Sequence, residues 1–386
     1  MTDPSRSLET AAAGDLRLER VELREVRMQL RAPFETSFGQ TTLRRILVVR
    51  AFDGSGAFGY GECTAPGEPF FNAETFETAW HVTTDFIGPL LSQRPPARAA
   101  DVGAALAPIR DHRMAKAGVE TAVWDLEAKL AGAPLWRHLG GTRASIDCGV
   151  SIGLQRSIAD LLEKVSLELE NGYKRIKIKI KPGQDVRLVE AIRARFPAIA
   201  LSVDANSAYS LDRDLGLLKE LDGYRLMMIE QPLAAGDLVD HSKLQRELRT
   251  PICLDESVVD LATARHAHEL GACRILNIKL GRVGGHAEAR AIQEFARTNG
   301  MPAWCGGMLE SGIGRAHNIA MATLAGFTLP GDISASARYF AEDIIEPPVT
   351  VSKEGVIPAP TAPGIGYAVD EARLVAMTIR REEIRV

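Results

Sequence analysis

Between residues 174 and 280 the chain contains five short apolar runs with charged residues near their ends: KRIKIKI (174–180), IALSVDA (199–205), LMMIEQP (226–232), PICLDES (251–257) and RILNIKL (274–280). The runs recur about every 25 residues, a length that holds a strand, a crossover helix and two short loops. The period continues in CGVSIG (148–153), MPAWCGG (301–307) and FTLPGDI (327–333). Eight such units predict a (β/α)8-type barrel. A doubly wound open sheet is the competing fold, but it lacks a convincing glycine-rich first turn here.

The sequence on either side of this period has a different pattern. Residues 16–130 combine strand-like stretches with helix candidates, which predicts a separate α+β domain. The strands are expected at Val21–Leu30 and Arg45–Phe52, and the helices at Ala73–Leu91 and Met114–Leu130. We place the barrel at residues 131–344. We expect the proline-rich residues 345–386 to return to the first domain, and residues 1–15 to form a mobile tail.

Composition limits the classes of function. Hydrophobic residues make up 46% of the 386 residues, and the net charge of -4 is too close to neutral for a protein that binds nucleic acid or a membrane surface through basic residues. The five scattered cysteines contain no C-x-x-C pair, and neither a signal peptide nor a membrane span is recognisable. We therefore expect a cytoplasmic protein that acts on a small molecule, with no nucleic acid and no membrane as partner.

Charged residues near the ends of successive runs suggest a metal site. Lys179, Asp204, Glu230, Asp255 and Lys279 follow one another at intervals of 25, 26, 25 and 24 residues. In a barrel these positions meet at one mouth, where three acids without a cation would repel each other. Oxygen ligands alone favour Mg2+, with Mn2+ as a possible substitute. The alternative is that each acid caps a helix or lies in a surface loop.

The lysines suggest proton transfer. Strand alternation directs Lys177 and Lys179 into the barrel, and Lys279 belongs to the sixth strand, opposite the second. A substrate carboxylate bound to the metal would hold its α-carbon between two amines. The metal and Lys177 should lower the pKa of Lys179 from about 10.4 toward neutrality. Removal of a proton on one face and its return on the other is racemisation, whereas removal followed by loss of a β-hydroxyl is dehydration.

Several motifs in this order resemble the enolase superfamily, and most closely its o-succinylbenzoate synthase/N-acylamino acid racemase branch. They are APFETSFG (32–39), YGEC (60–63), MAKAGVETAVWDLEAK (114–129), CGVSIG, the Lys177/Lys179 pair, DAN (204–206), IEQP (229–232), LDES (254–257), IKLGRVGG (278–285) and GGMLESGIGRAHNIA (306–320). The resemblance covers about residues 20–380. It implies a modified (β/α)7β barrel under an N-terminal capping domain that the C-terminal segment completes.

The resemblance also implies roles for individual residues. Asp204, Glu230 and Asp255 would be Mg2+ ligands, and Lys179 and Lys279 the acid/base pair of a site that stabilises an ene-diolate. The position of Arg282 is similar to that of a residue associated with racemase activity in the branch. Expected substrate contacts are Ser151, Arg282, Gly307, Met308 and Phe34, the last as a wall from the capping domain. We further expect a homo-oligomer.

Two departures and several alternatives remain at this point. Leu280 replaces the proline usual in the family, and Phe70, Phe71 and Asn72 occupy the capping loop where a Tyr-Ser pair is more common. Neither removes a predicted metal ligand or base, but the loop bears on specificity. A Schiff-base aldolase that uses Lys279 and a non-catalytic metal-binding barrel are the competing functions. The sequence does not choose between racemase and synthase.

Overall fold

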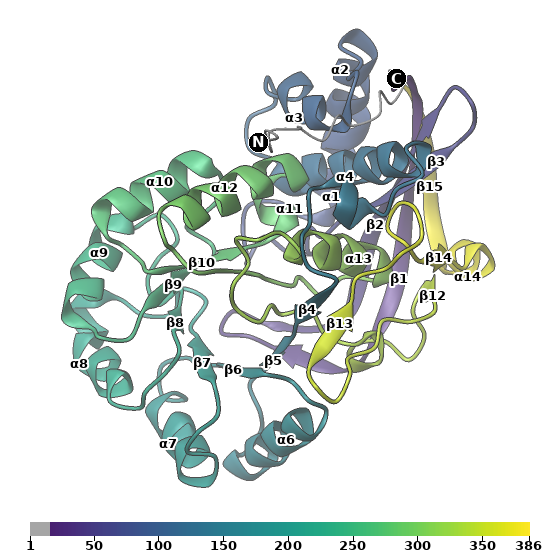
Figure 1. The fold of residues 1–386 in the computed structure, drawn as a ribbon. Coiled ribbons are helices and arrows are strands. Elements are labelled where there is room, and N and C mark those ends of the chain that lie inside the picture. Colours follow the sequence, from purple (N-terminus) through teal and green to yellow (C-terminus); the bar gives the residue numbers. More distant parts are fainter. Residues whose placement is uncertain (1–15) are drawn as a thin grey trace, which may run out of the picture.

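The computed structural model describes residues 16–386, so the tail predicted for residues 1–15 lies outside the described residues. The first domain contains a four-stranded antiparallel sheet in the order β15-β1-β2-β3. Its strands are β1 (Leu18–Glu35), β2 (Gln40–Asp53), β3 (Phe58–Cys63) and β15 (Thr378–Arg385). Because β15 comes from the end of the chain, this sheet joins the two ends of the described sequence (Figure 1).

Helices pack on one side of this sheet. They are α1 (Phe76–Val82), α2 (Gly88–Gln93), α3 (Val102–Ala105) and α4 (Arg113–Leu130), and the short α5 (Leu135–His138) follows and packs against α4. The backbones of α4 and β3 are so close that a Cβ on Gly61 would lie 2.2 Å from the carbonyl oxygen of Gly118. The helix predicted over Ala73–Leu91 is interrupted by a π-helical turn at Thr83–Ile87. Pro89 accounts for the interruption, since it has no N–H to donate and its ring crowds the preceding turn.

Seven parallel strands form the second sheet, in the order β11-β10-β9-β8-β7-β6-β5. They are β5 (Gly149–Ile152), β6 (Arg175–Lys179), β7 (Leu201–Asp204), β8 (Ile229–Glu230), β9 (Ile252–Leu254), β10 (Ile275–Ile278) and β11 (Ala303–Cys305). The eighth predicted run is not a regular strand. It joins the two edges of the sheet through bridges from Phe327 to Ala303 and from Gly331 to Cys148. Pro330 lacks the N–H that a continuous ladder needs. The result is the expected modified (β/α)7β barrel.

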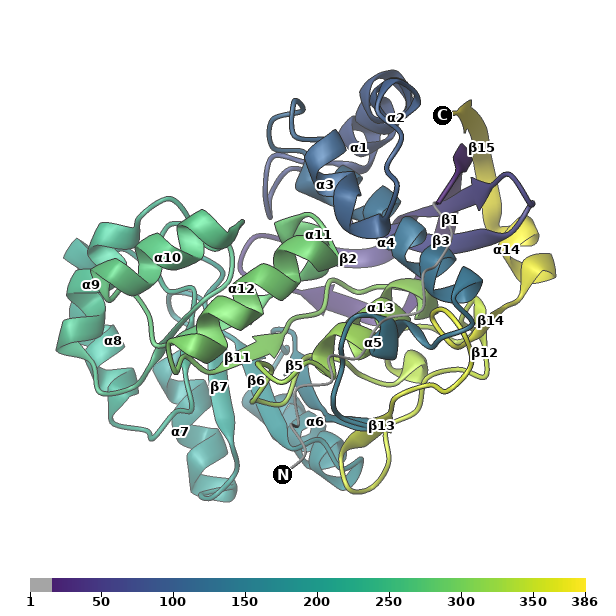
Figure 2. The same ribbon diagram turned by 45° about the horizontal axis from the view of Figure 1, so that its top comes forward.

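Helices surround the barrel sheet (Figure 2). They are α6 (Ile158–Glu170), α7 (Val186–Arg195), α8 (Leu211–Asp222), α9 (Leu238–Glu247), α10 (Leu261–Leu270), α11 (Leu280–Val283), α12 (His286–Thr298) and α13 (Gly312–Ala322). Their apolar residues recur every three or four positions, as Ala289, Ile292 and Ala296 do on α12, and these side chains are buried. The apolar faces of the helices pack against the strands and hold them in place. The ends of the strands lie outside this packing and can therefore have polar side chains.

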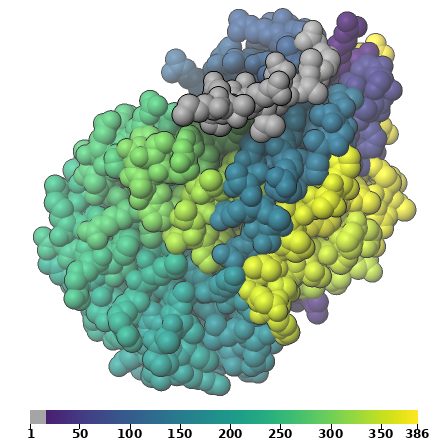
Figure 3. Space-filling model, viewed as in Figure 1, coloured from purple at the N-terminus to yellow at the C-terminus, as the bar shows by residue number. Residues whose placement is uncertain are grey.

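After the barrel the chain returns to the first domain. This segment contains β12 (Ile345–Glu346), β13 (Val356–Pro358), β14 (Ala368–Val369) and α14 (Glu371–Met377). β13 pairs with β4 (Ser145–Asp147) at the start of the barrel. In Figure 3 the C-terminal residues, in yellow, lie against blue residues from earlier in the chain. Within residues 16–386, no helix combines the length and the apolar character needed to cross a membrane.

The hairpin between β1 and β2 connects the first domain to the barrel through direct contacts. The backbone N–H of Leu154 donates to the carbonyl oxygen of Glu35 (3.0 Å), and Lys181 Nζ lies 3.4 Å from a carboxylate oxygen of Glu35. At the tip, Ser37 Oγ donates to the carbonyl oxygen of Asn206 (3.4 Å). Because Asn206 follows β7 by two residues, the hairpin lies beside the carboxyl ends of the barrel strands.

Candidate active site

The predicted lysines and acids lie at the ends of five neighbouring strands. Lys179 ends β6, Asp204 ends β7 and Glu230 ends β8, and the register pairs Lys179 with Asp204 and Asp204 with Glu230. Asp255 follows β9, and Lys279 follows β10. All five side chains belong to residues that are more than nine-tenths buried. They therefore form one polar layer at the barrel mouth.

One catalytic lysine candidate lies at each end of the row of acids. Lys179 Nζ lies 2.6 Å from Asp204 Oδ2, and Lys279 Nζ lies 2.7 Å from Asp255 Oδ2. Lys179 also donates to Asn206 Oδ1 at 2.7 Å. The two amines thus approach the carboxylates from different strands, as the sequence predicts.

Lys177 is a third ammonium in the layer. Its Nζ lies 2.7 Å from Glu230 Oε2 and 2.7 Å from Asp332 Oδ2, and Arg175 Nη2 lies 2.6 Å from the other oxygen of Asp332. Burial lowers the pKa of Lys177, but Asp332 and Glu230 outweigh burial and hold that pKa well above its ordinary value. Lys177 is therefore a fixed cation rather than a base.

The carboxylates of this layer lie close enough to one another to shift each other's pKa. Burial and the charge of Asp204 raise the pKa of Glu230 to about 7. Burial and the charge of Asp255 raise the pKa of Glu256 to about 8. Oε2 of Glu256 and Oδ1 of Asn277 are buried and accept no hydrogen bond. Acceptor oxygens without donors beside crowded carboxylates are the surroundings that a hard cation suits.

The donor set fits Mg2+, but the side chains are arranged around ammonium groups. Asp204, Glu230 and Asp255 offer only oxygen ligands. Within residues 16–386, no three His, Cys, Asp or Glu side chains are grouped closely enough to hold a metal ion. In the structure the lysines and Arg282 neutralise the acids instead. The metal site therefore stays a proposal that the chemistry of the residues supports.

Comparison with known families identifies the chain's relatives. A family model described as enolase C-terminal domain-like matches residues 160–373, more than half of the chain. A second, described as the N-terminal domain of mandelate racemase and muconate lactonizing enzyme, matches residues 19–140. The chain belongs to the enolase superfamily. Both the resemblance noted in the sequence and the two-part architecture are confirmed.

Individual members of the superfamily are similar over nearly the whole chain. An o-succinylbenzoate synthase of Geobacillus kaustophilus is 50% identical over 94% of this chain and 96% of the relative. An N-succinylamino acid racemase of Thermus thermophilus is 49% identical over 91% of this chain and 94% of the relative. A crystal structure of an enolase superfamily member from Listeria innocua shares 43% identity and a TM-score of 0.92, covering 96% of this chain and 99% of the other. The chain is accordingly an enzyme of the racemase or lyase kind.

The expected substrate contacts lie around the enolase-type mouth. Ser151 is on β5, and its buried Oγ has no hydrogen-bond partner. A Cβ on Gly307 would lie 2.5 Å from the carbonyl oxygen of Asp332, and the backbone N–H of Met308 donates to Glu310 Oε1 (2.7 Å). Phe34 packs edge-on against Tyr339, with ring centroids 6.3 Å apart. Of these groups, the Ser151 hydroxyl is a buried polar group left without a partner in the described part of the chain, whereas Phe34, Gly307 and Met308 are partly exposed.

Arg282 is held by contacts within the protein. Its guanidinium forms an ion pair with Asp255, donates from Nε to the carbonyl oxygen of Val258 (2.7 Å) and donates to the carbonyl oxygen of Asn277. The residue is 2% exposed. The guanidinium is engaged within the protein, and Arg282 also lines a cavity of about 230 Å³ with Phe71 and Glu256, so its contact with substrate stays a prediction. The ion pair ties Arg282 to Asp255, one of the predicted metal ligands.

The capping loop reaches the second lysine. Lys279 Nζ lies 4.7 Å from the centroid of the Phe71 ring, within the distance of a cation–π interaction. The divergent loop is therefore part of the site and lies on the side of Lys279.

Sequence reasoning missed three polar residues of this layer. Asp332 lies in the eighth run and pairs with Lys177; Asn206 accepts from Lys179 and donates to Glu256 Oε1 (3.0 Å). The signal was present, since Asp332 lies within an apolar run as the other acids do. Asn206 and Glu256 follow recognised acids by two and one residues, where strand alternation no longer predicts the direction of a side chain.

Proposed function

We propose that this enzyme removes the proton α to a carboxylate, as an N-acylamino acid racemase, an o-succinylbenzoate synthase or both. The observation that carries the proposal is the row of three buried carboxylates with Lys179 at one end and Lys279 at the other. The names of the most similar relatives, synthases and N-succinylamino acid racemases, support the substrate class.

Asp204, Glu230 and Asp255 would hold Mg2+, or Mn2+, through carboxylate oxygens. The ion would supply the positive charge that makes a carbon beside a carboxylate acidic. Its charge would also compensate the crowding that raises the pKa of Glu230. The lysines now paired with these acids would then be released toward the substrate.

Different residues remove the proton, return it and bind the substrate carboxylate. Lys179 Nζ, oriented by Asn206 Oδ1, takes the α-proton on one face, and Lys279 Nζ delivers a proton on the other. Lys177, kept charged by Asp332, attracts the substrate carboxylate. Return of the proton to the opposite face gives racemisation, whereas loss of a β-hydroxyl gives dehydration. One site can serve both reactions because the first step is shared.

The competing functions have less support. A Schiff-base aldolase would use Lys279 as its nucleophile, but it gives no role to the row of three carboxylates or to Lys179 at the other end of that row. A non-catalytic barrel does not explain two lysines at opposite ends of one row of acids.

The test is exchange in D2O. We expect the enzyme with Mg2+ to exchange the α-proton of at least one compound in a panel of N-succinyl and N-acetyl amino acids and the cyclohexadiene precursor of o-succinylbenzoate. NMR would follow the loss of the α-proton signal, and EDTA should stop it. Exchange of no compound, or undiminished exchange after EDTA treatment, would contradict the proposal.

We also propose a cytoplasmic homo-oligomer. The five cysteines are all buried and unpaired with one another, which suits a reducing compartment. Val375 on α14 and Ile379 on β15 are 56% and 52% exposed, and an apolar surface on an edge strand suits a contact between copies. Light scattering that gave the mass of a single chain would contradict the oligomer, and secretion of the native protein would contradict the compartment.

A further inference from the structure

Arg44, on β2, is a buried cation without an ion pair. The residue is 6% exposed, and no carboxylate within residues 16–386 lies at salt-bridge distance from its guanidinium. Nη2 donates to the carbonyl oxygen of Thr64 (3.1 Å), whereas the buried Nε has no hydrogen-bond partner. Burial lowers the pKa of Arg44, and the charges of Glu62 and Glu310 act against this only from a distance. A buried guanidinium normally has an anion beside it, because an unpaired buried charge is costly.

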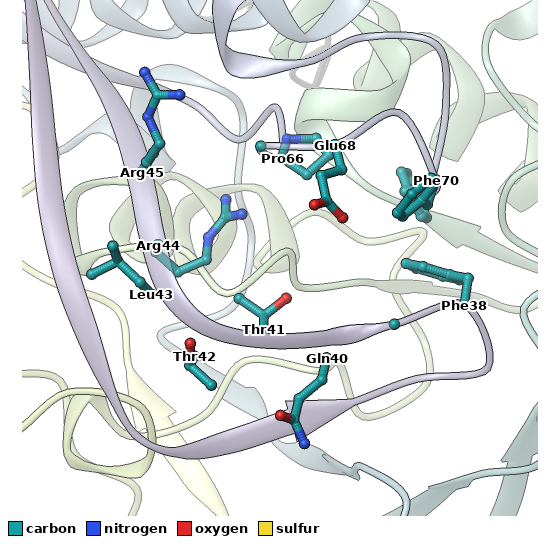
Figure 4. A pocket seen from close by; sticks show the side chains of 13 residues that line it. Phe38, Gln40, Thr41, Thr42, Leu43, Arg44, Arg45, Pro66, Glu68 and Phe70 are labelled. Carbon is teal, nitrogen blue, oxygen red and sulfur yellow. The ribbon is translucent and has the colours of Figure 1, made fainter.

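A cavity of about 270 Å³ adjoins Arg44. One wall is the hairpin that carries Phe38, Thr41 and Arg44, and the other is the loop that carries Phe70 and Phe71. Figure 4 shows the guanidinium of Arg44 on the side of the hairpin that faces this loop. Aromatic rings line the cavity together with polar side chains, the carboxylate of Glu68 among them.

Each wall of the cavity belongs to a segment that contacts one of the catalytic lysines or its hydrogen-bond partner. On the hairpin, Ser37 donates to the carbonyl oxygen of Asn206, whose side chain accepts from Lys179. On the loop, the ring of Phe71 lies 4.7 Å from Lys279 Nζ. All the residues that line the cavity belong to the capping domain, and its two walls contact the barrel beside the two lysines.

We infer that Arg44 binds the second carboxylate of the substrate, at the far end of its acyl chain. This rests on the proposed function, in which the first carboxylate lies beside the reacting carbon. A succinyl group has the required chemistry: two methylenes for the aromatic walls and a terminal anion for the guanidinium. Arg44 then selects ω-carboxyacyl amino acids over neutral acyl amino acids, and the chemistry at the lysines is unaffected by the choice.

The test separates binding from turnover. N-succinyl-2-aminoisobutyrate has no α-proton and cannot react, and its succinamoyl analogue replaces only the terminal carboxylate by a neutral amide. Calorimetry with the Mg2+-loaded enzyme should show the succinyl compound binding roughly 10- to 100-fold more tightly, the factor expected for one hydrogen-bonded charge. Arg44→Met should abolish this preference and leave the binding of the amide unchanged. Arg44→Lys, which keeps a cation, should retain part of it.

Arg45 provides the matched control. It is the next residue on β2, but its guanidinium is held by Glu25 (2.8 Å) and Glu77 (2.6 Å). Arg45→Met should keep the full preference for the succinyl compound. Equal binding of the two compounds by the wild type, or an equal loss for both in Arg44→Met, would overturn the inference and leave Arg44 a structural residue. If the wild type exchanged no α-proton yet showed the Arg44-dependent preference, the proposed function would fall and the binding site would stand.

Discussion

Asp204, Glu230 and Asp255 matter at the scale of single residues because each is buried, charged and positioned by the end of a strand. Removal of one carboxylate should take away one charged oxygen ligand without changing the strands. We expect Asp204→Asn, Glu230→Gln and Asp255→Asn each to weaken Mg2+ binding by about 100-fold or more. Titration calorimetry of the folded variants measures this.

Asp332→Asn is the comparison for that series. Asp332 is also acidic and its side chain is 8% exposed, but it pairs with Arg175 and Lys177. We expect its amide to change Mg2+ affinity far less than the other three substitutions. A uniform loss across all four variants would show that total charge, and not the three named ligands, controls binding.

Residues were predictable from the sequence where strand alternation fixes their direction. Lys177 and Lys179 alternate with isoleucines on β6, so their inward direction follows from the pattern. The role proposed for Arg44 was not predictable, because it depends on the lack of a carboxylate at salt-bridge distance within the described residues. The sequence does not show which side chains lie near one another in the fold. The ion pair of Arg282 with Asp255 was not predictable either, since it joins residues from two strand–helix units.

At the scale of elements, Glu120 links the capping domain to the barrel. From α4, its carboxylate accepts from the backbone N–H groups of His286 (2.8 Å) and Ala287 (2.9 Å), which begin α12. The indole of Trp124 donates to it as well (2.6 Å). Burial raises the pKa of Glu120 to about 7, and these hydrogen bonds only partly oppose the shift.

This shift predicts a pH dependence of stability. A carboxyl whose pKa is raised on folding, here from 4.5 to about 7, contributes stability that is present below pH 4.5 and lost as the pH rises through 7. Between pH 5 and pH 8 the wild type should lose about 2 to 3 kcal/mol relative to Glu120→Gln. Melting temperatures of both proteins across this range, compared at each pH, measure the loss as a difference of a few degrees.

Glu163→Gln is the control for this effect. Glu163 is exposed on α6, so its replacement should give a difference from the wild type that stays constant with pH. A constant difference for Glu120→Gln too would mean that Glu120 is ionised at this interface throughout the range.

Elements followed the sequence where the apolar period was uninterrupted. Residues 158–170 and 286–298 are helices with an amphipathic pattern, and between them the apolar runs form the predicted strands. Prolines caused both differences. Pro89 divides the helix expected over 73–91, and Pro330 reduces the eighth run to two bridges. The apolar pattern does not depend on backbone N–H groups, so it does not show that Pro89 and Pro330 each lack one.

At the scale of the whole molecule, the site is assembled from two domains. The barrel supplies the acids and lysines, and the capping domain supplies Phe71 and the cavity beside Arg44. The barrel was predictable because strand ends of one sheet must meet at one mouth. The contacts of the capping loops were not, because an irregular loop has no period from which the direction of its side chains follows.

The stereochemistry of exchange in D2O tests the central claim, that two lysines address opposite faces of one carbon. Both enantiomers of the best N-acylamino acid would be given separately to the Mg2+-loaded wild type, Lys179→Ala and Lys279→Ala, with NMR as the readout. The wild type should exchange both. Each variant should lose exchange of one enantiomer, a different one in each case, by about 10²- to 10⁴-fold. Loss of the same enantiomer in both variants, or normal exchange of both enantiomers by either variant, would contradict the account.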